Sequence, residues 1–107
     1  MPEEEYQEAF QLIAFAGDSK SDSMRAIAEA KKGNYEEAEE LLKSAEEKLN
    51  KSHVAQFDLI QKEAGGDKVP VNIILVHAQD HVTMAIMMKD IAAEILDLYR
   101  QIGRKDA

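Results

Sequence analysis

The residues best suited to chemistry in this sequence lie in one short segment, His77-Ala78-Gln79-Asp80-His81. His77 and His81 are four positions apart, so on an α-helix both imidazoles project from the same side. Neutral imidazole binds zinc, and it is also a nucleophile at neutral pH because its ordinary pKa is about 6.5. The segment therefore predicts either a metal site or a histidine that accepts a transferred group.

A small metal-dependent hydrolase is one interpretation of this segment. The order His-Ala-Gln-Asp-His partly resembles the His-x-x-Glu-His motif of inverzincin metalloproteases. In this interpretation His77 and His81 bind zinc, and His53 is a candidate for a third ligand. Asp80 takes the position of the glutamate, and 107 residues leave little room for a protease cleft.

A phosphoryl-accepting histidine is the second interpretation. Such a residue must be reachable by partner proteins, must keep its ring in one tautomer, and needs hydrogen-bond donors for the phosphoryl oxygens. His77 falls near the start of a predicted helix, where free N–H groups and positive potential suit an arriving phosphoryl group. Gln79, or a group from a neighbouring subunit, is placed to hydrogen-bond the phosphoryl group or the ring. A structural oligomerisation module without chemistry remains a third interpretation.

Two groups of helix-breaking residues divide the chain into three parts. Gly33-Asn34 predicts one turn, and Gly65-Gly66-Asp67 with Pro70 predicts the other. The stretches between them are rich in Ala, Glu, Leu, Lys and Met, which favour helices. We expect helices at about residues 3–32, 35–64 and 72–102. The sequence thus predicts an all-α, three-helix, up-down-up bundle that forms one domain over residues 1–107.

The first two predicted helices each contain an irregularity in the apolar stripe. On the first, Gly17 interrupts the apolar stripe and indicates either a tolerated weak spot or kink, or the close approach of a backbone or ligand. On the second, His53 and Gln56 lie on the apolar face, as a satisfied core pair or as part of a site. The expected apolar stripes are Tyr6, Phe10, Ile13, Gly17, Met24, Ile27 and Ala28 on the first helix, and Leu42, Ala45, Leu49, His53, Gln56 and Ile60 on the second.

The third predicted helix has two apolar stripes, and three helices alone cannot bury both. The stripe that suits packing inside the bundle comprises Ile74, Ala78, Ala85, Met88, Ala92, Leu96 and Tyr99. The other comprises Ile73, His77, Asp80, Met84, Met87, Ile91 and Leu98, and it predicts self-association. A carboxylate in such a seam is costly, so Asp80 is expected either to meet its symmetry copies around a cation or to reach solvent at the edge.

Composition excludes several classes of function. With 13 Lys+Arg, 21 Asp+Glu and a net charge of -8, the chain lacks the basic surface that nucleic acid requires. It has no Cys, so disulfide scaffolds and thiolate metal sites are excluded. No long uncharged apolar stretch predicts membrane insertion, and the acidic N-terminus is unlike a signal peptide. We expect a cytoplasmic protein.

Five segments together resemble the lactose/cellobiose-type enzyme IIA component of the bacterial sugar phosphotransferase system. They are Ala16-Gly17-Asp18-Ser19-Lys20-Ser21, Gly33-Asn34-Tyr35-Glu36-Glu37-Ala38, His53-x-x-Gln56, and Val76-His77-Ala78-Gln79-Asp80-His81 with the later Met88-Lys89-Asp90. The resemblance covers nearly the whole chain. Departures from the family pattern are Val82-Thr83 in place of Leu-Met, and Ser19-Lys20 in place of the commoner Ala-Arg.

This resemblance implies a specific set of properties. The fold would be a homotrimer of helical hairpin bundles with the third helix lining the central seam. His77 would be the phosphoacceptor, at Nε2, and Asp80 would gather around a metal ion, Mg²⁺, on the threefold axis. The clefts would lie between subunits and would be lined by Gly17, His53 and Gln56, with Gln79 and His81 beside His77.

The resemblance also implies the partners and the process. The donor would be the histidine-containing phosphocarrier protein and the acceptor the enzyme IIB component. The sugar would be a β-linked disaccharide of the lactose or cellobiose class, phosphorylated on entry through the membrane component.

Overall fold

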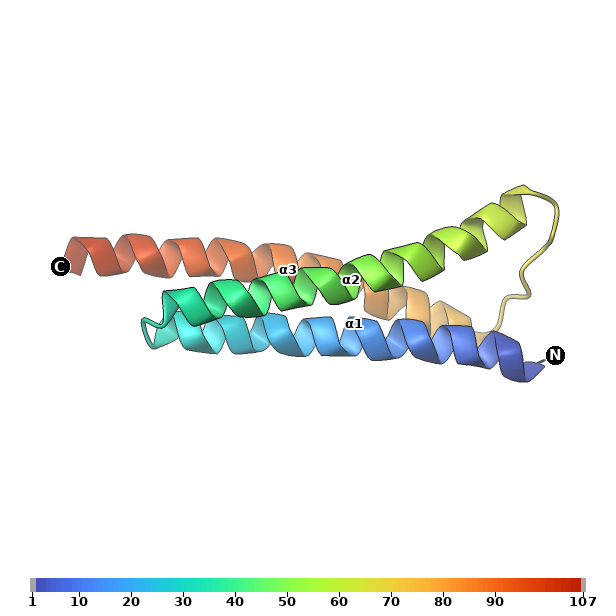
Figure 1. Ribbon diagram of the computed structural model, residues 1–107, viewed down its shortest axis with the longest axis horizontal. Coiled ribbons are helices and arrows are strands. Elements are labelled where there is room, and N and C mark those ends of the chain that lie inside the picture. The colour runs from blue at the N-terminus through green and yellow to red at the C-terminus, as the bar shows by residue number, and fades with distance from the viewer. Residues whose placement is uncertain (1, 107) are drawn as a thin grey trace.

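A computed structural model of the protein describes the backbone of residues 2–106 and the side chains of residues 6–103. It consists of three long helices, α1 (Pro2–Lys31), α2 (Tyr35–Ala64) and α3 (Ile73–Asp106). Successive helices run in opposite directions and form a rod of 59 × 22 × 18 Å (Figure 1). α1 packs along both other helices, whereas α2 bends away from α3 toward the loop that joins them (Figure 1). The predicted all-α, three-helix, up-down-up arrangement is confirmed.

Glycines end the first two helices in the left-handed backbone conformation. Gly33 has a φ of 87° and Gly66 a φ of 93°. At the first turn the Asn34 N–H donates to the Glu29 carbonyl oxygen and the Gly33 N–H to the Ala30 carbonyl oxygen. This pairing satisfies carbonyls that the helix end would leave free, and it is the Schellman arrangement. The two predicted turns therefore form where a glycine adopts the left-handed backbone conformation.

Replacing Gly33 with Ala should destabilise the fold by about 1 kcal/mol, because a Cβ disfavours the left-handed conformation. Gly17→Ala is the matched control, since α1 continues through this position and no atom lies within 4 Å of an added Cβ. That change should stabilise the protein by about 0.5 kcal/mol or more. Urea unfolding of both variants measures the two effects. If both changes stabilised the protein, or both destabilised it, the role given to the left-handed glycine at the helix end would be contradicted.

Alanine dominates the core and lets the helices approach closely. One cluster lies where α1 meets the start of α3 and the second half of α2, and a smaller one lies toward the α1–α2 turn. The buried members of the first are Ala9, Leu12, Ala16, Leu49, Leu59, Ala78, Val82 and Ala85, and those of the second are Ala26, Ala30, Ala38 and Leu96.

The expected apolar stripe of the first helix is wrong. Phe10 and Met24 are 57% and 53% exposed, and α1 instead buries small residues such as Ala16 and Ser19. The reason is its central position, because α1 contacts two neighbours and small side chains allow both to come close. α1 runs without a break through Gly17, as expected from the single helix predicted over about residues 3–32.

The two stripes predicted on the third helix are observed in the described chain. The packing stripe includes the fully buried Ala78, Ala85 and Ala92. The other stripe is exposed along its length, from Ile73 at 86% to Leu98 at 56%. α3 also extends to Asp106, four residues beyond the expected end.

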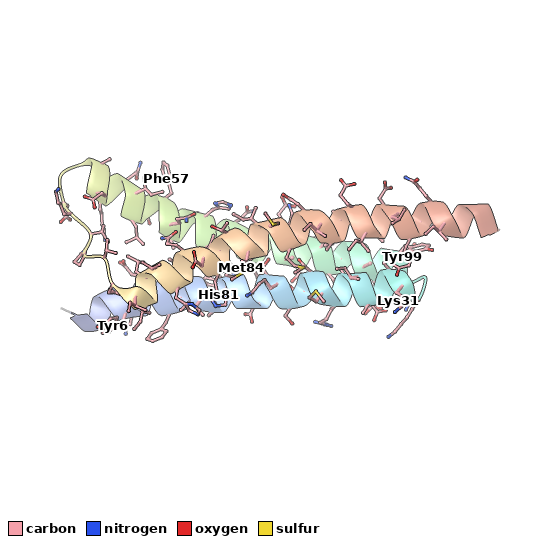
Figure 2. The ribbon with its side chains drawn as sticks, turned by 180° about the vertical axis from the view of Figure 1, so that it is seen from behind. Tyr6, Lys31, Phe57, His81, Met84 and Tyr99 are labelled. Carbon is pink, nitrogen blue, oxygen red and sulfur yellow. The ribbon has the colours of Figure 1, made fainter. Side chains whose placement is uncertain are left out.

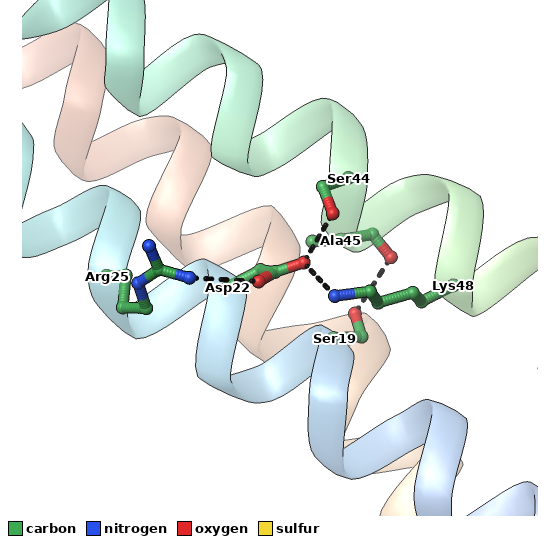
Figure 3. A network of polar contacts seen from close by, with 6 residues as sticks. All are labelled: Ser19, Asp22, Arg25, Ser44, Ala45 and Lys48. Carbon is green, nitrogen blue, oxygen red and sulfur yellow. Dashed lines mark hydrogen bonds and ion pairs between the residues drawn. The ribbon is translucent and has the colours of Figure 1, made fainter.

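A buried polar group joins α1 to α2 between the two apolar clusters (Figure 3). Asp22 accepts hydrogen bonds from the Ser44 hydroxyl at 2.6 Å and from Lys48 Nζ at 2.8 Å. The Ser19 hydroxyl donates to the Ala45 carbonyl oxygen at 2.9 Å. Burial raises the pKa of the Asp22 carboxyl, but the bonds from Lys48 and Ser44 outweigh it and lower the pKa below its ordinary 3.8.

Asp22→Asn should therefore destabilise the bundle by about 1–3 kcal/mol at neutral pH, because it weakens a buried charged hydrogen-bond group. A lowered folded-state pKa contributes stability that is present above 3.8 and lost as the pH falls through the folded-state value. The difference in the free energy of unfolding between wild type and Asp22→Asn should thus become smaller below pH 3.8. Urea unfolding across this range measures it, with the exposed Asp58→Asn as control; a difference that does not change with pH would contradict the argument.

Candidate functional site

The start of α3 places the predicted chemical segment at the surface of the bundle. Asn72 precedes the helix, and its side-chain oxygen accepts a hydrogen bond from the Leu75 N–H at 2.9 Å. This cap satisfies one of the free N–H groups of the first turn. His77 lies in the second turn and its side chain is exposed. It is therefore reachable by a partner protein.

His77 and His81 contact each other through their ring nitrogens. The two Nε2 atoms are 3.0 Å apart, and the rings meet edge to face with centroids 4.4 Å apart. One nitrogen must carry a proton and the other a lone pair for this distance to be a hydrogen bond. The helical spacing of four brings the rings together, as predicted for the two histidines.

Lys20 of α1 decides which histidine donates. Its Nζ lies 2.9 Å from Nδ1 of His81, at the crossing of α1 and α3 where Figure 2 labels His81. An ammonium group only donates, so Nδ1 of His81 accepts and the His81 proton lies on Nε2. That N–H then donates to Nε2 of His77, which keeps an in-plane lone pair.

His81 is held in its neutral form. Burial lowers the pKa of its imidazole first, and the charges of Lys20 and His77 lower it further, against an opposing effect of Asp80. A neutral ring is required by the bonding pattern, because an imidazolium could not accept from Lys20. The pKa direction and the hydrogen-bond geometry therefore agree.

Gln79 and Gln56 contact each other between α3 and α2. The Gln56 amide nitrogen donates to the Gln79 side-chain oxygen. Gln79 thus faces α2, while His77 leaves the opposite side of α3, so the expected contact of Gln79 with the His77 ring does not form within one chain. It would require His77 of a neighbouring subunit.

The remaining predicted residues lie apart from this pair. His53 is exposed rather than on the packed face of α2, where Ser52 and Leu49 are buried instead. Its predicted pairing with Gln56 is therefore wrong, because Gln56 turns toward Gln79. Gly17 lies three positions before Lys20 on the same side of α1, with no atom within 4 Å of an added Cβ.

Asp80 is exposed on the apolar stripe of α3. Within residues 6–103, no three His, Asp or Glu side chains lie close enough together to bind a metal ion. The three histidines of the hydrolase interpretation therefore do not form one site. One Asp80 per chain also cannot hold a magnesium ion by itself, so such a site fits only an assembly in which copies of Asp80 converge.

Comparison with known proteins decides the family. The family described as "PTS system, Lactose/Cellobiose specific IIA subunit" matches residues 7–100. The chain belongs to this family. It is thus a IIA component of the sugar phosphotransferase system, and its role is in phosphoryl transfer. The resemblance identified from the sequence is confirmed.

Relatives of this IIA chain are named for different sugars. It is 49% identical to the lichenan-specific phosphotransferase enzyme IIA component of Bacillus subtilis, over 95% of this chain and 93% of the relative. It is 37% identical to the lactose-specific EIIA component of Streptococcus mutans, over 86% of this chain and 88% of the relative.

Solved structures of IIA proteins have the same fold. The cellobiose-specific enzyme IIA of Bacillus anthracis is 43% identical, with a TM-score of 0.91 over 92% of this chain and 91% of the other. The IIA(Chitobiose) chain from a complex with HPr of Escherichia coli is 28% identical, with a TM-score of 0.80 over 91% of this chain and 94% of the other. In the described part of the present chain, no helix has the length and apolar character needed to span a membrane.

Sequence reasoning missed Lys20 as a member of the IIA site. With no Lys or Arg inside the His77–His81 segment, positive charge was expected only from partners or from the helix N-terminus. The structure instead brings Lys20 to His81 across 61 positions of sequence. The only signal available was its place in the Ala16–Ser21 segment that resembles the family, where it stands in place of the commoner Arg.

Proposed function

We propose that this IIA component accepts a phosphoryl group on Nε2 of His77 from the histidine-containing phosphocarrier protein HPr and passes it to the enzyme IIB component. The observation that carries the proposal is the exposed His77 ring, whose Nε2 faces the N–H of His81 at 3.0 Å. Its nitrogen is therefore unprotonated, and its lone pair accepts that N–H in the resting site. A solved complex of the related IIA(Chitobiose) with HPr supports the donor.

The transfer needs little covalent work from the protein. The His77 ring first gives up the hydrogen bond from His81, because its Nε2 has a single in-plane lone pair. That lone pair attacks phosphorus in line, and a new N–P bond forms as the bond from phosphorus to the donor nitrogen breaks. The donor nitrogen keeps the electron pair of the broken bond. The His81 N–H, which His77 accepts in the resting site, is then placed to donate to a phosphoryl oxygen. Transfer to IIB is the same displacement with His77 as the leaving group.

The proposed assembly is a homotrimer with α3 lining the central seam. Its support is the exposed apolar stripe, in which Met84, Met87 and Ile91 are each about half exposed or more. A stripe of this length is unusual on a monomer. A trimer would also bring Gln56 and Gln79 of one subunit toward a neighbouring His77, in clefts where Gly17 and His53 would lie.

Asp80 lies on this seam stripe, so a threefold axis would bring three carboxylates together. Carboxylates that converge repel one another, and we propose that Mg²⁺ binds them on the axis. Carboxylate oxygens are the ligands that this ion prefers. The ion would offset the negative charge of the Asp80 carboxylates, and it would take no part in phosphoryl transfer.

The proposed process is uptake of a β-linked disaccharide of the lactose or cellobiose class by a cytoplasmic IIA protein. The lichenan-specific and cellobiose-specific relatives support this sugar class. The net charge of -8 favours partners with basic rims, and complexes with them should form quickly and be sensitive to salt.

Incubation with phosphoenolpyruvate, enzyme I and HPr tests the proposal. Intact mass should show one phosphoryl group per chain, and the group should be lost in acid as expected for a phosphohistidine. Subsequent addition of the IIB component should remove it. An unchanged mass with a demonstrably active donor would contradict the carrier function and would favour the structural-module interpretation.

A further inference from the structure

Lys20 occupies an unusual place in the bundle. Within residues 6–103, its contact with His81 is the one side-chain hydrogen bond that joins α1 to α3. Both side chains are half-buried, so the ammonium group is held against the ring rather than extended into water. A lysine loses side-chain entropy and hydration when held in this way, and packing alone does not require it.

This contact fixes which ring nitrogens of His81 and His77 carry a proton. Lys20 occupies Nδ1 of His81, which forces the His81 proton onto Nε2. That proton faces Nε2 of His77, which must then be unprotonated. Without Lys20, His81 could carry its proton on either nitrogen. In the other tautomer the His81 lone pair would face His77 and would favour a proton on the acceptor atom.

We propose that Lys20 is a positioning residue for phosphoryl transfer, which holds His81 in the Nε2–H tautomer and so keeps Nε2 of His77 unprotonated. The proposal rests on His77 being the phosphoacceptor. After transfer, the same His81 N–H donates to a phosphoryl oxygen, and the positive charge of Lys20 behind it strengthens that bond. Lys20 itself touches His81 and not the reacting atoms.

Three variants separate this role from packing and from net charge. Lys20→Met keeps most of the aliphatic stem but removes the donor and the charge. Lys20→Arg keeps both, so it should restore much of the function. Lys43→Met removes one positive charge from an exposed position of α2 and serves as the matched control. Lys20→Gln, a neutral polar residue, replaces Lys20→Met if that variant fails to fold.

The first readout is the tautomer of each histidine, measured by NMR correlation of ¹⁵N-labelled rings with their carbon-bound protons. At a pH well above the ordinary histidine pKa of about 6.5, wild type should show the proton on Nε2 of His81 and on Nδ1 of His77. Lys20→Met should give a mixture for His81. Lys20→Arg and Lys43→Met should match wild type.

The second readout is the rate of phosphoryl transfer from phosphorylated HPr in a single turnover. Lys20→Met should be slower by about tenfold to a hundredfold, the effect typical of losing a group that orients a metal-binding histidine. An unchanged His81 tautomer would overturn the proposal, and so would a tautomer shift without a slower rate. If wild type carried no phosphoryl on His77, the proposed function would fail, while the NMR result would still report whether Lys20 orients His81.

Discussion

His77→Ala should remove phosphorylation completely and leave the fold intact. The ring is exposed, and its one polar contact with residues 6–103 is the bond to His81, so its loss should change the free energy of unfolding by about 0.5 kcal/mol or less. The nitrogen of His81 that lies beside the His77 position is Nε2, which carries a proton while Lys20 holds Nδ1, so His81 does not replace the missing acceptor. Intact mass after incubation with the phosphoryl donors should therefore show only the unmodified chain.

His53→Ala is the matched control for this variant. His53 is also an exposed histidine on a helix, but it lies outside the His77–His81 pair. The control chain should still take one phosphoryl group, with at most a change of rate if His53 lines a cleft between subunits. Full phosphorylation of His77→Ala, or its loss in His53→Ala with the fold intact, would assign the acceptor to another residue.

Ile91→Glu should break the proposed trimer. Ile91 lies in the middle of the exposed apolar stripe and is 47% exposed in the single chain. A threefold seam would bury three copies of the new carboxylate, and an unpaired buried charge costs several kcal/mol. Association should weaken by a hundredfold or more, since each 1.4 kcal/mol is about tenfold. Sedimentation equilibrium across a range of protein concentrations measures this.

Two other variants make the trimer test specific. Ala93→Glu adds the same carboxylate at an exposed position on the far side of α3, so assembly should be unchanged. Asp80→Leu replaces a costly carboxylate by an apolar side chain and should keep or strengthen assembly while removing its dependence on Mg²⁺. Dissociation of Asp80→Leu, or of Ala93→Glu to the same degree as Ile91→Glu, would contradict an α3 seam.

Local features of the sequence were enough to predict the three helices and the exposed stripe. Gly33 and Gly66 mark the helix ends because only glycine adopts their positive φ without strain. The two stripes of α3 were predictable because its apolar residues recur at helical spacing, with alanines such as Ala78 and Ala85 on the packed stripe and larger side chains on the exposed one. The pairing of His77 with His81 follows from the same spacing within one helix.

The packed face of α1 and the surroundings of His53 were not predictable in the same way. A search for large apolar residues selects Phe10 and Met24, yet the bundle buries Ala16 and Ser19 and leaves the large residues exposed. Which face of a helix is buried depends on how closely its neighbours approach, and a central helix needs small side chains toward both. His53 lies outside the packed face of α2, where Leu49 and Ser52 are buried instead.

The sequence by itself determined where the helices begin and end and which segment carries the histidines, because these depend on interactions between residues a few positions apart. Only the tertiary structure decided which ring nitrogens of His77 and His81 carry a proton. Lys20 and His81 are 61 positions apart, and their contact depends on the register in which α1 and α3 cross. That register is set by the alanines packed between the two helices, so the state of the His77 nitrogen is a property of the bundle and not of the motif.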